Sequence, residues 1–193
     1  ATTGLNEIIL DGIRIDSPES VIEHMENVYF KKLKEDIVAF DAKKRVQEIL
    51  AYANKTQETL GQDILKAPYC ELAYFPTLKY GTYGYENYFM AYALYPEVIE
   101  KSFSLQADYH LLRNKAAAIA YREGKLPPYI RLDFDMADSR GTLVDIKSLD
   151  TIWFPHFARC LEPLLTTGVK AIWHCDGNLM QMVPRLLEVG LKG

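Results

Sequence analysis

The pattern of apolar and polar positions predicts helices over most of the first two thirds of the chain. Ser17, followed by proline and glutamate, is a helix start, and this helix is expected to run to about Lys34. A second helix is predicted after Asp41, where apolar residues recur at the spacing of one buried helical face. Pro96 opens a long amphipathic helix that is expected to reach Tyr121.

The stretch from Pro68 to Pro96 is rich in aromatic residues, with eight tyrosines and two phenylalanines. The simpler interpretation is that these rings pack loops and helices together. The alternative is an aromatic lid in which Tyr80, Tyr83 and Tyr85 stack on a flat substrate or on a partner, because the adjacent glycines would permit the lid to move.

After Gly124 the pattern changes to alternating strands and helices. Strands are predicted at 129–135 and 169–175, and helices from Asp150 to about Thr167 and over 179–189. Short connections between such elements are typical of parallel βαβ units. We therefore expect an α/β protein, a single domain over 1–193 that forms a portion of a (β/α)8 TIM barrel with N-terminal helices. A closed barrel takes about 250 residues, so the expected barrel is incomplete and truncated.

Two motifs place polar groups at the ends of the predicted strands, LDFDMADSRG (132–141) and WHCDGNL (173–179). Catalytic groups collect at the C-terminal ends of parallel strands. Because side chains alternate along a strand, Asp133 and Asp135 share one face, and His174 and Asp176 share one face that excludes Cys175. The sequence therefore predicts a site at these strand ends.

Each of these residues also has a purely structural interpretation. His174 could be a hydrogen-bonded packing histidine, and Asp176 could be a turn former before glycine. Asp133 and Asp135 could mark a solvated strand end or pair with Arg131 or Arg140, whereas two carboxylates in one pocket would shift each other's pKa as acid/base groups do. Asn178 is most simply the N-cap of the last helix.

Composition and charge exclude several classes of protein. The formal charge of −4 gives no basic surface for nucleic acid. The three cysteines form no CxxC pair, so neither a disulfide framework nor a zinc ribbon is indicated, and a reducing cytoplasm is expected. No signal peptide is visible at the start of the sequence. No apolar run approaches the length that crosses a bilayer, so no membrane association is expected.

The two motifs, with Pro155 and the VPRLLEVG sequence at 183–190, resemble the uroporphyrinogen-decarboxylase superfamily. The resemblance covers about the last third of the chain and is looser over 96–124. It implies a TIM barrel with its site at the strand ends. The decarboxylase branch uses an arginine-rich N-terminal segment and an essential aspartate without a cofactor, and that segment is not found here. The methyltransferase branch transfers methyl groups to or from a corrinoid, usually with zinc.

In the methyltransferase branch the zinc ligands are a His-x-Cys pair and a later cysteine. The matching positions here are His174 and Asp176, so a carboxylate replaces the first thiolate. The loss of a thiolate makes the site harder and more Lewis acidic, which suits the polarisation of an oxygen such as that of a methoxy substrate. A further ligand is expected beyond Gly193.

The resemblance therefore implies a corrinoid-linked methyltransferase that acts with a corrinoid protein and a small methyl donor or acceptor. Asp135 and His174 are the candidate catalytic residues, and zinc would be held by His174 and Asp176. Candidate substrate-binding residues are Asp133, Asn178, Tyr83 and Arg140. Two alternatives remain, a porphyrinogen decarboxylase-type lyase without cofactor and a non-catalytic protein that binds a tetrapyrrole or a corrinoid protein.

Overall fold

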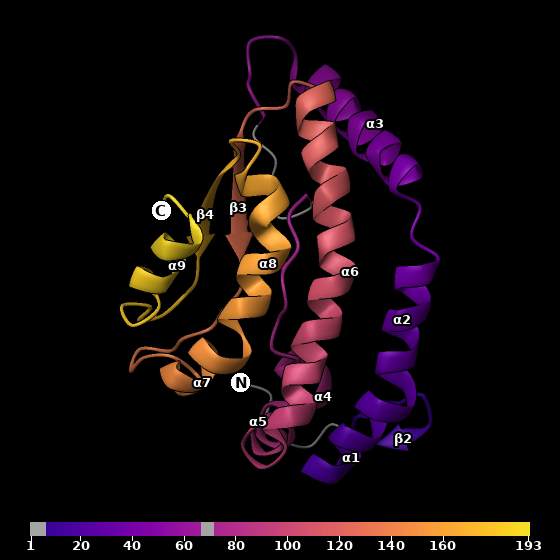
Figure 1. The fold of residues 1–193 in the computed structure, drawn as a ribbon, viewed down its shortest axis with the longest axis vertical. Helices are drawn as coiled ribbons and strands as arrows, with labels where there is room; N and C mark the ends of the chain where they lie inside the picture. The colour runs from indigo at the N-terminus through magenta and orange to yellow at the C-terminus, as the bar shows by residue number, and fades with distance from the viewer. Residues whose placement is uncertain (1–6, 67–71) are drawn as a thin grey trace.

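The computed structural model describes residues 7–66 and 72–193. The first third of the chain consists of a short antiparallel hairpin followed by helices that run up one side of the molecule (Figure 1). Its elements are β1 (Ile9–Leu10), β2 (Ile13–Arg14), α1 (Pro18–His24), the π-helix η1 (Met25–Tyr29), α2 (Phe30–Val38) and α3 (Ala42–Leu60).

The remaining elements include the longest helix and the parallel strands. They are α4 (Tyr80–Tyr83), α5 (Tyr85–Leu94), α6 (Pro96–Glu123), β3 (Tyr129–Asp133), α7 (Ile146–Ile152), α8 (Phe154–Leu165), β4 (Lys170–His174) and α9 (Val183–Val189). The aromatic stretch thus contains the helices α4 and α5, while its residues Pro68 and Tyr69, together with Cys70, lie outside the described residues.

The predicted helix starts are confirmed at three positions. The side chain of Ser17 accepts a hydrogen bond from the Ser20 amide, and that of Asp41 accepts one from the Lys44 amide. Pro96 is the first residue of α6. Capping groups and proline at the first helical position act locally, which is why the sequence predicts these starts well.

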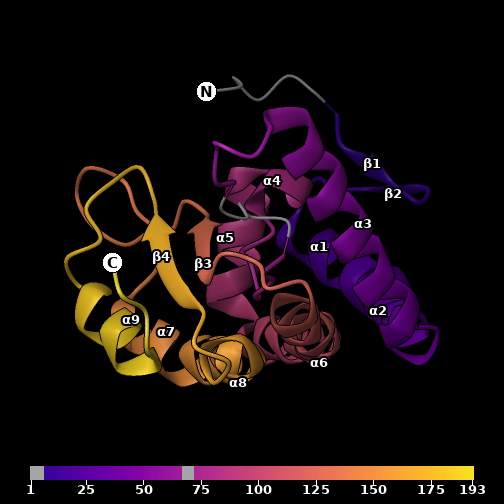
Figure 2. The same cartoon turned by 90° about the horizontal axis from the view of Figure 1, so that it is seen from above.

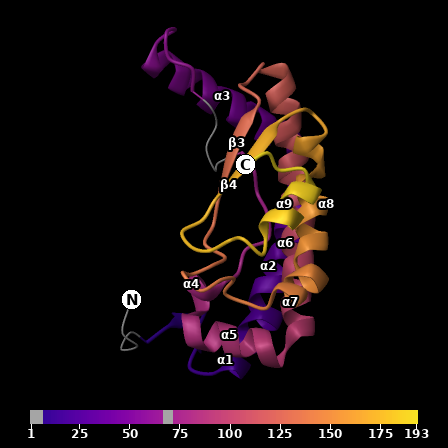
Figure 3. The same cartoon turned by 90° about the vertical axis from the view of Figure 1, so that its left-hand side faces the viewer.

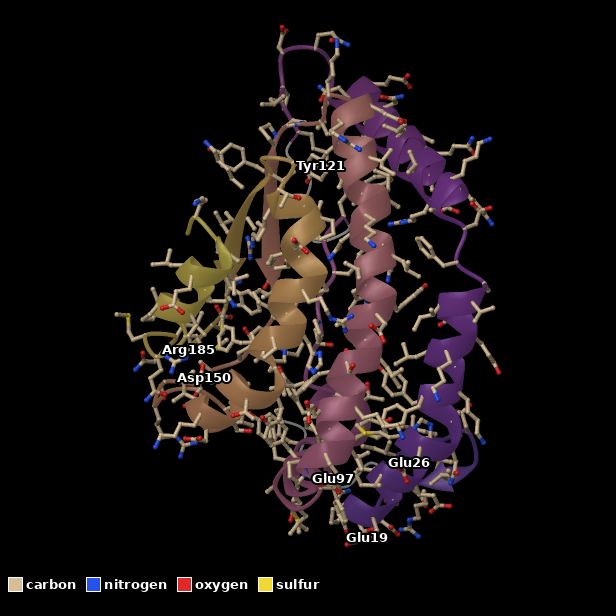
Figure 4. All side chains as sticks on the ribbon, viewed as in Figure 1. Glu19, Glu26, Glu97, Tyr121, Asp150 and Arg185 are labelled. Atoms are coloured by element: carbon tan, nitrogen blue, oxygen red, sulfur yellow. The ribbon has the colours of Figure 1, made fainter. Side chains whose placement is uncertain are left out.

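The helix boundaries in the last third differ from the prediction. The side chain that caps α7 is Asp145, not Asp150, and α7 and α8 are two helices that meet at Trp153. Residues 179–182 form a turn before α9 begins at Val183. Arg185 on α9 forms a double hydrogen bond with Asp150 on α7, and the two side chains point toward each other in Figure 4. Asp150 therefore joins two helices instead of capping one.

The strands β3 and β4 pair in parallel with Asp133 opposite His174. Ile130, Leu132 and Ala171 are buried on the face that α8 covers, and the helices α6 and α8 lie on one side of the sheet in Figure 2. By strand alternation Asp133 and His174 lie on the opposite face. The described part of the chain places no helix over the centre of that face, as Figure 3 also shows.

The expected TIM barrel is wrong. Among residues 7–66 and 72–193 the strands form only two two-stranded sheets, and the fold is a mostly helical α/β arrangement. The backbone of Lys192 and Gly193 adds two hydrogen bonds to the edge of β4. The sequence does encode one parallel βαβ unit, from β3 to β4. The other segments have the apolar spacing of helices, so they supply no further strands for a barrel.

The segment from Leu72 to Lys79 is extended but forms no strand, and side-chain amides provide hydrogen bonds to its backbone N–H and C=O groups. It runs beside β3 and α6 (Figure 1). The buried Asn114 amide on α6 bonds both the N–H and the C=O of Tyr74, and the buried Gln106 amide bonds both groups of Thr77. A buried backbone group without a partner costs about 1–3 kcal/mol, so these amides substitute for a neighbouring strand.

An aromatic cluster joins this segment to the sheet and to α8. Trp153 is fully buried, stacks on Phe157 at 4.5 Å between ring centroids, and donates its indole N–H to the carbonyl of Pro76. Phe75 lies 5.0 Å from the ring of Trp173 on β4. These aromatic contacts therefore pack the 72–79 segment, α8 and β4 against one another.

Candidate functional site at the strand ends

A hydrogen-bonded histidine–aspartate pair lies at the C-terminal ends of β3 and β4. His174 Nδ1 is 3.0 Å from Asp133 Oδ1. The two residues are opposite each other in the parallel register, so the sheet itself sets this contact. The His174 side chain is 45% exposed and that of Asp133 is 25% exposed, which leaves the imidazole accessible to a ligand.

Arg131 holds the other oxygen of the same carboxylate. Its Nη2 atom is 2.7 Å from Asp133 Oδ2. Arg131 and Asp133 are two residues apart on one strand, so their side chains share a face. A guanidinium on one oxygen and an imidazole on the other restrict the rotation of the carboxylate. The chain Arg131–Asp133–His174 therefore orients the imidazole ring.

This orientation determines which histidine nitrogen is available. An ionised carboxylate only accepts hydrogen bonds, so the proton of a neutral His174 ring lies on Nδ1 and the lone pair lies on Nε2. Nε2 is 3.7 Å from Oδ1 of Asp176, whose side chain is 86% exposed. An imidazole with a free Nε2 beside a carboxylate can accept a proton or bind a metal ion.

A second group of polar atoms lies beside this pair. Asp135 Oδ1 accepts a hydrogen bond from the Asp176 amide at 2.9 Å, and its carbonyl accepts one from the Tyr80 hydroxyl at 3.1 Å. Cys175 Sγ accepts a hydrogen bond from the Met136 amide. Burial, and to a lesser degree the Asp135 charge, raise the pKa of the Cys175 thiol, which favours its protonated form.

Two predicted substrate-binding residues, Arg140 and Asn178, have other partners. Arg140 forms a double hydrogen bond with Asp138, and this contact lowers the pKa of the Asp138 carboxyl. The Asn178 side-chain oxygen accepts a hydrogen bond from the Met180 backbone amide, and the backbone N–H of Asn178 donates to the Asp138 carbonyl. Asn178 therefore stabilises the turn before α9 and does not cap a helix.

Tyr83 lies in the core and not at the strand ends. It is 1% exposed, and its hydroxyl is 3.0 Å from Nδ1 of the buried His24. His24 Nε2 is in turn 2.9 Å from Asp11 in the β1–β2 turn. Burial raises the pKa of the Tyr83 phenol. These contacts hold the N-terminal hairpin on α1 and α4.

The donor set at the strand ends fits part of a zinc site. His174 Nε2 and Asp176 Oδ1 are adjacent donors of suitable type, and Asp133 supplies the carboxylate that usually orients a ligating histidine. No group of three or more such ligands is present among residues 7–66 and 72–193. The described residues therefore offer two candidate ligands, His174 and Asp176, and a carboxylate, Asp133, that orients the histidine.

Aromatic rings form one side of the site. Tyr80, whose hydroxyl reaches Asp135, lies 5.2 Å from Tyr85, 5.7 Å from Phe89 and 5.8 Å from Phe134 between ring centroids. The Tyr85 side of this group borders a cavity of about 290 Å³, whose other walls include the Asp138–Arg140 ion pair, Thr142 and Gln181. We call Tyr80, Tyr85, Phe89 and Phe134 the aromatic wall.

The sequence offered Arg131 only as an ion-pair partner of the aspartates, a pairing that the structure shows for Asp133. It did not indicate the orienting role of Arg131, nor Phe134 and Phe89 as parts of a wall. Alternation along the strand carried a signal for Arg131, because it shares a face with Asp133. The wall had no such signal, since Phe134 and Phe89 are 45 positions apart in the sequence and are brought together by their shared contact with Tyr80 on α4.

Gly177 packs the two strand-end loops against each other. Its φ is +139°, and a Cβ atom there would lie 2.6 Å from the Ala137 carbonyl oxygen. The glycine thus permits the backbones of the two loops to approach each other closely. We expect Gly177→Ala to lower the free energy of unfolding by about 1–3 kcal/mol, measured by chemical denaturation. The control Gly81→Ala meets open space in a helical turn, and an equal loss in both variants would contradict this explanation.

Comparison of the chain with protein-family models, with curated proteins and with solved structures gave no significant match. Across the described residues no helix has the length and apolar character needed to span a membrane.

Proposed function

We propose that this chain belongs to a corrinoid-linked methyltransferase of the kind that its strand-end motifs resemble. In this proposal the protein transfers a methyl group between a small methylated donor and a corrinoid that a partner protein carries. The observation that carries the proposal is the hydrogen bond from His174 to Asp133, because it leaves Nε2 free beside Asp176 on an accessible face.

The residues of the chain have distinct roles in the proposed reaction. His174 Nε2 binds or deprotonates the reacting molecule, and Asp133 stabilises the positive charge that the ring gains when it takes a proton. Asp135 contacts substrate from the neighbouring strand end. Zinc, where bound, would be held by His174 and Asp176 and would supply Lewis-acid activation of an oxygen or a thiol.

The free thiols of Cys160 and Cys175 support a cytoplasmic location for this protein.

The test combines metal content with a spectroscopic assay of methyl transfer. We expect the purified protein to contain stoichiometric zinc, to lose it in His174→Ala, and to convert reduced cobalamin to methylcobalamin with a methyl donor, read from the visible spectrum. His156→Ala, a half-buried histidine on α8 near Glu100, is the matched control that keeps both properties.

Other results would replace the proposal. Release of CO₂ from a porphyrinogen by the metal-free protein would establish the lyase alternative. Tight binding of a corrinoid protein without turnover of any methyl donor would establish a binding protein.

A further inference from the structure

We infer that the aromatic wall and its neighbouring carboxylates bind a cation with N-methyl groups, such as a quaternary ammonium compound. This inference rests on the proposed function, since it names the class of methyl donor. Its physical basis is the combination of exposed ring surface and negative charge at one edge of the sheet. Aromatic faces attract a cation within about 6 Å of the ring centroid, and quaternary ammonium groups are recognised in this way.

The ring surface is accessible where it borders the cavity. Tyr85 is 56% exposed although it packs 4.7 Å from Phe89 and 5.2 Å from Tyr80 between centroids. Two neighbouring rings hold the Tyr85 ring in place, yet more than half of it faces solvent, so it contributes little to the hydrophobic core. It presents a preformed apolar surface beside a cavity of about 290 Å³, which is at the small end of ligand pockets. A small methylated ammonium suits that size.

The hydrogen bonds of the wall connect it to the candidate catalytic residues. The Tyr80 hydroxyl donates to the Asp135 carbonyl at 3.1 Å, and the Asp135 carboxylate accepts from the amide of Asp176. Asp176 lies next to His174 Nε2. A ligand on the exposed ring of Tyr85 is therefore one ring away from Tyr80, whose hydroxyl contacts the backbone of Asp135.

The charge balance favours a cationic ligand over a neutral one. Arg131 pairs with Asp133, and Arg140 pairs with Asp138, so these four charges cancel. Among the described residues the ion pair of Asp176 is the one with His174 Nε2, at 3.7 Å, and Asp135 forms none. Asp135, together with Asp176 while the His174 ring is neutral, thus leaves negative charge at the edge of the wall, and this charge attracts a cation and disfavours an anion. A neutral aromatic ether would gain from stacking but not from this field.

Isosteric probes separate the charge from the shape of the ligand. We expect calorimetry to show that choline and tetramethylammonium bind, and that 3,3-dimethylbutan-1-ol, the uncharged analogue of choline, binds at least about tenfold more weakly. Tyr85→Leu should weaken choline binding about tenfold, whereas Tyr85→Phe, which keeps the ring, should retain it. Asp135→Asn should weaken it severalfold and reduce its dependence on salt. Tyr52→Leu, an exposed tyrosine on α3, is the matched control.

Two outcomes would overturn the inference. One is equal binding of choline and its uncharged analogue, and the other is preferential binding of methoxybenzene. The binding assay does not depend on turnover. Methyl transfer from methoxybenzene without choline binding would overturn this inference and leave the proposed function intact. Choline binding that needs Tyr85, without methyl transfer from any donor, would support the inference and reject the proposed function.

Discussion

His174→Ala is expected to lower the rate of methyl transfer by about 10²–10⁴-fold, which is the usual contribution of a positioned acid or base. The imidazole is the only side chain of the Asp133–His174 pair that has an atom free for a ligand, since Nδ1 is committed to the carboxylate. Alanine removes both the proton acceptor and the candidate metal ligand. Single-turnover formation of methylcobalamin, followed in the visible spectrum, measures this loss.

Asp133→Asn tests the orienting role separately. Loss of such a supporting carboxylate typically costs about 10–100-fold in activity or metal affinity. The asparagine amide also allows the other tautomer of His174, in which Nε2 carries the proton and cannot act as a base or ligand. Thermal unfolding of both variants shows whether the fold is kept. A fully active Asp133→Asn protein would contradict the orienting role, and an active His174→Ala protein would contradict the site.

The strand-end site was predictable because it depends on local rules. An apolar run followed by polar residues marks the end of a buried strand, and alternation assigns Asp133 and His174 to faces without knowledge of the tertiary fold. The contact of Asp133 with His174 also required the register of β3 with β4, which no single segment specifies. The sequence therefore predicted that Asp133 and His174 lie at the strand ends, but not that they form a pair.

The arrangement of the first two thirds was less predictable because tertiary contacts set it. Asn114 and Gln106 are polar residues at buried positions of α6, and only the backbone of the segment beside them explains why they are tolerated. This segment, Leu72 to Lys79, runs beside β3 but forms no strand with it. The strand-end motifs of the last third therefore belong to a two-stranded sheet and not to a barrel. Tyr83 was assigned to a lid from its neighbouring glycines, while its contact with His24, 59 positions away, places it in the core.

Trp153→Ala is expected to lower the free energy of unfolding by about 3–5 kcal/mol. The side chain is fully buried and packs against Phe154, Phe157 and Trp173, so alanine leaves a cavity between α8 and the sheet. It also leaves the Pro76 carbonyl without its donor. Denaturant unfolding followed by circular dichroism measures the change. Val38→Ala, at an 88% exposed position on α2, should change stability by no more than about 0.5 kcal/mol.

Trp153→Phe divides this cost into packing and hydrogen bonding. Phenylalanine keeps most of the ring contact with Phe157 but removes the indole N–H, so the expected loss is about 1–3 kcal/mol, the cost of an unsatisfied buried carbonyl together with a small cavity. Since Pro76 lies in the segment that leads to Tyr80, the same variant should also weaken choline binding by the aromatic wall. A stability loss without any change in binding would show that the segment beside β3 holds the wall independently of Trp153.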